Sequence, residues 1–315
     1  MQQCGVDSEK QREILLNFSS GEELLTATKA LSCSLADVMV QRERLLFGRE
    51  EEEIRDRLRR RWEIMRQSAT LGLQELHRTQ GGLIGGEARI LEERYRQGRT
   101  LLAGLSGRAL IYAMGVMEVN AGLGRIVAAP TAGSAGVLPG VLLAMVETER
   151  YGEEAVLDAL LVASALGLLI TARASVSGAE AGCQAEVGSA SAMAAAALVA
   201  LEGGTAEEML GAATHALSNL LGLVCDPVRG LVELPCQRRN ALGALNAFAA
   251  ADLSLAGIAG PVPFDEMVAA LYAVGRALPP SLRETAQGGL AACPSWQAAG
   301  ASGTGGGCTA CCACV

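Results

Sequence analysis

The chain has 315 residues, of which 50% are hydrophobic and only 3% aromatic, and its formal net charge is −8. This acidic balance argues against a nucleic-acid-binding protein, which needs a basic face to neutralise phosphates. The chain has only two lysines, Lys10 and Lys29, which argues against pyridoxal-phosphate chemistry and against a Walker A site. It has only two histidines, His77 and His215, which argues against a multi-histidine zinc site.

Residues 1–100 carry many charges and predict a helical N-terminal region. Residues 1–16 lack the basic-then-apolar pattern of a signal peptide, and together with 10 cysteines this indicates a cytoplasmic protein in a reducing compartment. Ser34 and Asp37 have the spacing of a capping box, and apolar residues then recur at helical spacing to about residue 68. The charge run at residues 49–61 is typical of a solvated helix face, with a partner-binding surface as the alternative.

From about residue 101 the composition shifts to Ala, Gly, Val and Leu, which predicts an all-α catalytic core over residues 101–292. Small side chains and few aromatic ones favour helices that approach one another closely. Thr205 and Glu208 form a second capping box, and glycine and proline pairs at 203–204 and 279–280 end helices. Helices are predicted at residues 107–119, 137–151, 154–171, 188–201, 206–221, 240–255 and 265–277.

The most apolar run, residues 155–172, reaches the minimum length of a membrane span of about 18 residues. It contains Asp158, and a charge inside so short a run favours a buried core helix over a membrane helix. No membrane partner is therefore expected.

A Gly- and Ala-rich loop lies within residues 120–140 and is followed by a new apolar run. Thr131, Gly133 and Ser134 offer hydroxyl and backbone N–H groups just before that run, an arrangement that suits a carboxylate ligand. A tight helix–helix connection would have the same composition.

Three cysteines lie among small or turn-forming residues. Cys183 precedes an Ala-rich helix, where a helix N-terminus favours the thiolate. Cys225 follows GLV and precedes Asp226-Pro227, and Cys236 follows Leu234-Pro235 after ten intervening residues (236 − 225 − 1). From spacing alone these cysteines are either metal ligands or small buried hydrophobic residues.

Four ordered blocks carry a resemblance to a known family. They are EVNAGLGRIVAAPTAGSAGVLPG, SVSGAEAGCQAEVGSASAMAAAAL, NLLGLVCDPVRGLVELPCQRRNALGALNA and LPPSLRETAQGGLAA. From roughly residue 34 to residue 292 the chain resembles the α subunit of the iron–sulfur-dependent L-serine dehydratases, also called L-serine ammonia-lyases. The resemblance implies an all-helical catalytic domain whose Gly- and Pro-rich loops carry the ligands Cys183, Cys225 and Cys236 of a [4Fe–4S] cluster.

The resemblance also implies the reaction. Serine loses water by α,β-elimination, with the open iron acting as a Lewis acid, and the product becomes pyruvate and ammonia. Asn120, Thr131 and Ser134 are expected to position the substrate. The β part of the family, with its SSSHT-type segment and catalytic histidine, is missing from this sequence, so the chain is expected to work with a β subunit that supplies the base. His215 is a local candidate base, with a helical core histidine as the alternative.

Residues 293–315 form a Cys- and Gly-rich segment that composition predicts to be a flexible tail. In some relatives a C-terminal cysteine occupies the open iron, and Cys293 and Cys314 are candidates here; a disordered, metal-scavenging tail is the alternative. Two further functions stay open: a related lyase acting on threonine or cysteine, and a cluster that serves in sensing or electron transfer. Clusters of the latter kind usually have four protein ligands.

Overall fold

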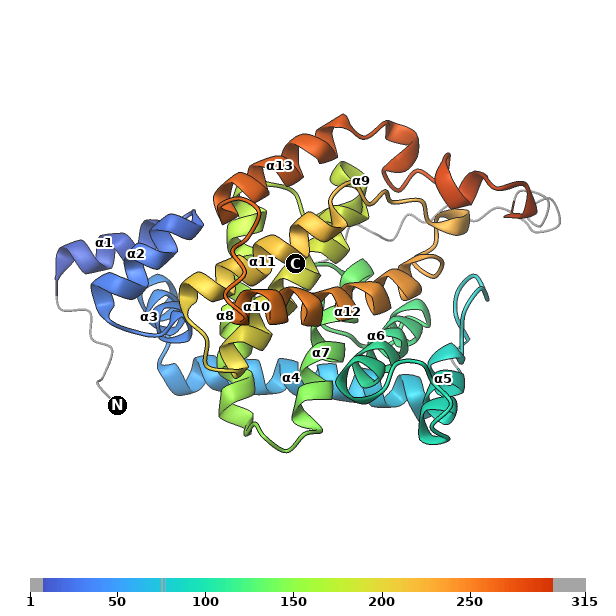
Figure 1. Ribbon diagram of the computed structural model, residues 1–315, viewed down its shortest axis with the longest axis horizontal. Coiled ribbons are helices and arrows are strands. Elements are labelled where there is room, and N and C mark those ends of the chain that lie inside the picture. The colour runs from blue at the N-terminus through green and yellow to red at the C-terminus, as the bar shows by residue number, and fades with distance from the viewer. Residues whose placement is uncertain (1–7, 75, 77, 297–315) are drawn as a thin grey trace.

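The computed structural model describes residues 8–74, 76 and 78–296, and over these residues the predicted all-α class is confirmed (Figure 1). Within this part of the chain the only β-type pairing is one isolated bridge, between Cys225 and Arg283. The α-helices are α1 (Glu9–Asn17), α2 (Gly21–Leu31), α3 (Leu35–Phe47), α4 (Glu51–Gln74), α5 (Glu87–Arg96), α6 (Gly104–Ala121), α7 (Val137–Val146), α8 (Glu153–Arg173), α9 (Gly178–Ala181), α10 (Ser189–Leu201), α11 (Ala206–Leu220), α12 (Cys236–Leu255) and α13 (Phe264–Ala277). The short helical turns are η1 (Ala132–Ser134), the π-helical turn η2 (Gln184–Gly188), η3 (Val228–Gly230), η4 (Pro280–Leu282) and η5 (Gly289–Ala292).

The predicted helix starts rest on side-chain caps that the structure contains. The side chains of Ser34 and Thr205 accept from the backbone N–H three residues later, and the carboxylates of Asp37 and Glu208 reach back to complete both capping boxes. The helix expected at 137–151 ends earlier, at Val146, and Glu149 just beyond it has a positive φ of 58°.

Helix α10 is the centre of the fold. It packs against α7, α8, α11 and α12, and nearly all of its residues are buried (Figure 1). Helix α4 runs along one side from the α1–α3 end to the α5 end, and it packs against α6. The main hydrophobic cluster takes residues from both sides of position 100, such as Trp62 and Leu166. The division of the chain near residue 100 stays a prediction.

Among the residues that the structure describes, two helices are long and apolar enough to cross a membrane. They are α8 and the continuous segment Gln184–Leu201, and 67% and 89% of their most apolar windows are buried inside the fold. Asp158 in α8 has its partner in α4, where Arg55 Nη1 lies 3.0 Å from it. Both segments therefore have the environment of core helices.

Part of the charge run at residues 49–61 joins α4 to α8. Arg55 and Arg59 contact the Glu154 carboxylate at 3.1 and 2.7 Å. Glu154 is 58% exposed, so solvent screens both pairs and each adds little stability. These residues thus form contacts within the chain in addition to facing solvent.

Small residues let α4 and α6 approach closely. A Cβ atom built on Gly72 would lie 2.2 Å from the carbonyl oxygen of Gly115. Gly136 and Gly140 of α7 and its cap meet the backbone of Ala113 in the same way. The abundant glycines therefore allow helices to cross at short distances, and the composition has few aromatic side chains that would hold them apart.

Replacing Gly72 with Ala should lower the stability of the protein. Alanine has the better helix propensity by about 1 kcal/mol, but its methyl group would meet backbone that no rotamer change can move, and overpacking costs about 1–3 kcal/mol. We expect a lower midpoint in thermal or denaturant unfolding. Gly152→Ala is the matched control, because a Cβ there has no neighbour within 4 Å. Equal midpoints for the two variants would contradict the close crossing.

Candidate metal centre

Three buried thiols come from three separate segments. Cys183 immediately precedes η2, Cys225 lies in the loop between α11 and α12, and Cys236 is the first residue of α12. Their exposed fractions are 2%, 2% and 4%. All three are free cysteines, as is the partly exposed Cys293.

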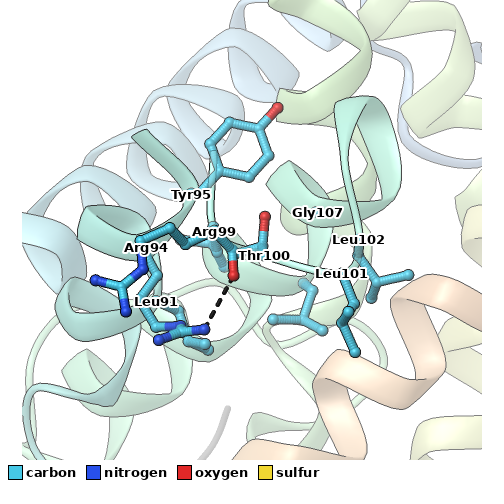
Figure 2. A pocket seen from close by; sticks show the side chains of 10 residues that line it. Leu91, Arg94, Tyr95, Arg99, Thr100, Leu101, Leu102 and Gly107 are labelled. Carbon is cyan, nitrogen blue, oxygen red and sulfur yellow. Dashed lines mark hydrogen bonds between the residues drawn. The ribbon is translucent and has the colours of Figure 1, made fainter. Parts of the chain in front are cut away.

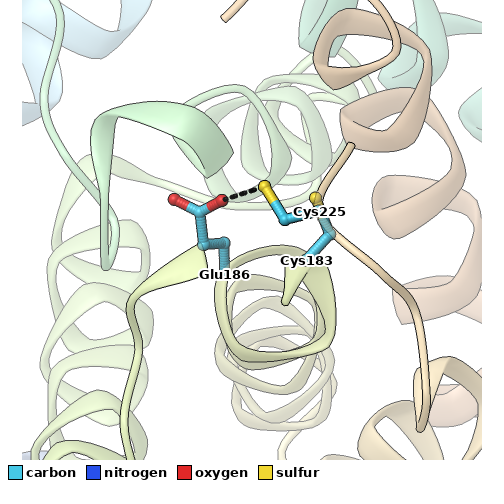
Figure 3. Close-up of side chains that lie close together, drawn as sticks. All are labelled: Cys183, Glu186 and Cys225. Atoms are coloured by element: carbon cyan, nitrogen blue, oxygen red, sulfur yellow. Dashed lines mark hydrogen bonds between the residues drawn. The ribbon is translucent and has the colours of Figure 1, made fainter. Parts of the chain in front are cut away.

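Cys183 and Cys225 lie side by side with the carboxylate of Glu186 (Figure 3). One ligand atom from each of these residues lies within 4.8 Å of the other two, and Cys225 Sγ is 4.0 Å from Glu186 Oε2. Contact with the Cys183 side chain, followed by burial, raises the pKa of the Cys225 thiol. Burial, followed by the nearby Cys183 and Glu186, raises the pKa of the Cys236 thiol, so Cys236 belongs to the same electrostatic neighbourhood.

Gln184 ties the Cys183 segment to the Cys225 segment. Its backbone N–H donates to the Leu223 carbonyl at 2.9 Å, and its side-chain oxygen accepts from the Gly222 N–H at 2.8 Å. The side-chain amide donates to the Leu271 carbonyl of α13, and the side chain is fully buried. Since each polar atom of Gln184 has a partner, the π-helical turn is held in one position beside the loop.

A segment near residue 283 holds Cys225 from the other side. The Cys225 N–H donates to the Leu282 carbonyl at 2.9 Å, and the Glu284 N–H donates to the Cys225 carbonyl at 2.8 Å. These two hydrogen bonds form the isolated parallel bridge with Arg283. The block LPPSLRETAQGGLAA therefore contacts the cysteine site.

Cys236 lies in the first turn of α12, which corrects two expectations: that loops carry all the ligands, and that this helix begins at residue 240. The polar residues after Cys236 resemble a loop in the sequence, but they have buried partners. Gln237 donates to Glu118 at 2.8 Å, and the Asn240 amide donates to the carbonyls of Cys236 and Gly133 at 2.9 and 2.8 Å.

Glu186 is the residue to which the sequence assigned no role. Burial raises the pKa of its carboxyl to about 7, the neighbouring Glu284 adds to the rise, and the Thr131 hydroxyl opposes it. A Cβ atom on Gly178 or Gly133 would lie 2.6 or 2.8 Å from this carboxylate, so glycine is needed on both sides. One signal in the sequence could have placed Glu186 beside Cys183: the two are three residues apart, and residues i and i+3 lie on one helix face.

The three residues expected to position substrate occupy the loop before α7. Thr131 donates to Glu186 Oε1 at 2.9 Å and lies 3.1 Å from the Ser134 hydroxyl, and Ser134 is fully buried. Asn120 donates to the Ala132 carbonyl at 3.2 Å. Thr131 therefore lies at the cysteine site, and Ser134 contacts Thr131 from the buried side. Asn120 holds the loop before α7 through its hydrogen bond to Ala132.

The remaining described candidates have hydrogen-bond partners outside this group. His215 on α11 is buried and its Nε2 lies 3.0 Å from the Ile258 carbonyl, beyond the end of α12. Cys293 Sγ lies 3.8 Å from the Gly289 carbonyl. Cys314 falls outside the described residues.

A cavity of about 530 Å³ lies between α5, the loop that follows it and α6 (Figure 2). Arg94 donates to the Arg99 carbonyl at 2.9 Å along its wall. The lining residues are Leu91, Arg94, Tyr95, Arg99, Thr100, Leu101, Leu102, Gly107, Leu110 and Ile111. Since this lining contains no thiol, carboxylate or histidine and shares no residue with the cysteine site, we do not assign chemistry to it.

Comparison with known proteins gives a consistent result. A family model described as "Serine dehydratase alpha chain" matches residues 30–291. The L-serine dehydratase alpha chain of Peptoniphilus asaccharolyticus is 42% identical over 87% of this chain and 94% of its own length. A probable L-serine dehydratase alpha chain of Bacillus subtilis is 45% identical over 88% and 92%. The L-serine dehydratase of Streptomyces coelicolor is 38% identical over 87% of this chain but only 60% of its own length. The chain therefore belongs to the serine dehydratase alpha chain family.

Proposed function

We propose that this chain is the α subunit of an L-serine dehydratase, a lyase that converts L-serine to pyruvate and ammonia with a [4Fe–4S] cluster held by Cys183, Cys225 and Cys236. The observation that carries the proposal is the convergence of buried groups: donor atoms of Cys183, Glu186 and Cys225 lie within 4.8 Å of one another. Cys236 is joined to the same region by Asn240, which donates to the carbonyls of Cys236 and of Gly133 beside Glu186. Membership of the family supports L-serine as the substrate.

The donor set fits a cluster. Thiolates are the usual ligands of iron–sulfur clusters, and three of them leave one of four irons without a cysteine from this set. The raised pKa values of the Cys225 and Cys236 thiols mean that a bound cation must offset the cost of ionising them. When bound, the cluster would supply a Lewis-acidic iron for the oxygen atoms of the substrate.

The chain's own polar groups bind and orient the substrate in this proposal. Glu186, held by the Thr131 hydroxyl, is placed to accept a hydrogen bond from the substrate ammonium group. Thr131 and Ser134 offer their hydroxyls beside it, and Asn120 positions the loop that carries them. The ring of His215 is engaged by the Ile258 carbonyl, so we place the general base on the partner subunit.

The proposed partner is a separate β subunit. The chain matches relatives named alpha chain over 92% and 94% of their lengths, whereas it covers 60% of the Streptomyces coelicolor dehydratase. A second chain would supply the part of that relative which this chain does not match. We place the enzyme in the cytoplasm, where a reducing environment keeps ligand thiols free.

Each proposed ligand should be needed for iron binding. We expect about four irons per chain after anaerobic reconstitution of the wild type, and loss of most of this iron in Cys183→Ala, Cys225→Ala and Cys236→Ala. Cys293→Ala is the control and should keep its iron, because the three ligands remain. Full iron in the Cys236→Ala protein, by metal analysis and absorption spectrum, would remove that residue from the ligand set.

Glu186→Gln should lower kcat/KM for serine by about tenfold to a hundredfold, which is the worth of a hydrogen bond to a charged group. The iron content should not change. Pyruvate release would be measured with the β subunit co-expressed, and Glu180→Gln, an exposed substitution in the same segment, is the control. Equal loss in both variants, or loss of iron in Glu186→Gln, would contradict a role in substrate binding.

The holoenzyme should release ammonia and keto acid faster from serine than from threonine or cysteine. Serine should also change the EPR signal of the reduced cluster, since a substrate bound near an iron alters its surroundings. Preference for threonine or cysteine would reassign the substrate. A cluster EPR signal that does not change when serine, threonine or cysteine is added would indicate sensing or electron transfer instead.

A further inference from the structure

Arg239 makes a three-way contact beside the cysteine site. One nitrogen, Nη1, lies 2.7 Å from the Val224 carbonyl, 2.7 Å from Asp226 Oδ1 and 3.5 Å from the sulfur of Cys183. The side chain is only 14% exposed. Arg239 thus joins α12 to both the Cys225 loop and the Cys183 sulfur.

Asp226 extends this contact to the C-terminal part of the described chain. Its Oδ2 accepts from the Leu290 N–H at 2.7 Å, and its side chain is 4% exposed. A Cβ atom on Gly289 would lie 2.2 Å from the same oxygen, and Gly289 has a positive φ of 58°. The turn at 289–290 is therefore fitted closely against Asp226.

Arg239 places a positive charge beside a proposed cluster ligand, since its Nη1 donates to the Cys183 sulfur. A cation that donates to a sulfur ligand stabilises the electron-rich form of an iron–sulfur cluster and raises its reduction potential.

We propose that Arg239 is a positioning residue with two roles. It holds the Cys183 sulfur in place, and through Asp226 it holds the 289–290 turn against the cysteine site. The contact with Cys183 sets the electronic surroundings of the cluster, and the contact with Asp226 links those surroundings to the C-terminal segment. The first consequence rests on the proposed function, because it needs a cluster. The second depends only on the contacts of the chain itself.

The test compares Arg239→Met, Arg239→Lys and Asp226→Asn with the wild type. Arg150→Met is the control, since Arg150 forms a surface pair with Glu202. Amide hydrogen exchange of the peptide containing Leu290, measured on the full-length chain without added iron, should be about tenfold faster in Arg239→Met and in Asp226→Asn. Arg239→Met removes the cation that holds the Asp226 carboxylate, and Asp226→Asn replaces the charged acceptor of the Leu290 N–H with a neutral amide. The control should exchange at the wild-type rate.

The second measurement is the reduction potential of the reconstituted cluster, followed by EPR. We expect a more negative potential than wild type in Arg239→Met and a potential close to wild type in Arg239→Lys, which keeps a positive charge. Asp226→Asn should shift the potential less than Arg239→Met does, because it keeps the donor to Cys183. A merely structural role would give the same potential in Arg239→Lys and Arg239→Met.

The outcomes separate the two proposals. A wild type that binds no iron would overturn the proposed function, and the exchange of Leu290 would still test the seating of the turn. A wild-type cluster with an unchanged potential in Arg239→Met would overturn the link to Cys183. Unchanged exchange of Leu290 in both Arg239→Met and Asp226→Asn would overturn the link to the C-terminal segment.

Discussion

The cysteine site depends on the burial of several acidic groups, thiols and carboxyls, in one small region. The thiols of Cys225 and Cys236 and the carboxyls of Glu186 and Glu284 all have raised pKa values there, with burial among the main causes. Arg239 contributes one positive charge within reach of Cys183. Ionising these groups in place would be costly without a bound cation, which agrees with the metal cofactor proposed from the convergence of their donor atoms.

The surrounding fold keeps these groups together through buried amides and close helix packing. Gln184 and Asn240 have no exposed surface, and each bridges chain segments that are distant in the sequence. Glycines bring α6 into close backbone contact with α4 on one side and with α7 on the other. A rigid framework of this kind would hold the proposed ligands in place before a cofactor binds, which lowers the entropy lost on binding.

Much of the fold could be predicted from the sequence, because it follows from local signals. Helical periodicity and the capping boxes at Ser34 and Thr205 gave the class and several helix starts. The start of α12 at Cys236 could not be predicted, since its first turn is stabilised by Glu118, which lies far away in the chain, and by Asp226 of the preceding loop. Glu186 went unassigned for the same reason: its contact with Thr131 spans 55 residues. The ligand set itself came from family resemblance and remains a proposal.

The bridge between Cys225 and Arg283 has a consequence for biosynthesis. The backbone that supports Cys225 is made only after the ribosome has translated α12 and α13, so the cysteine site cannot close on a partly made chain. Chains fold from the N-terminus during synthesis, so Cys225 stays without this backbone support until residues 282–284 have been made. A cofactor that binds as proposed would therefore bind only after residues 282–284 have been made.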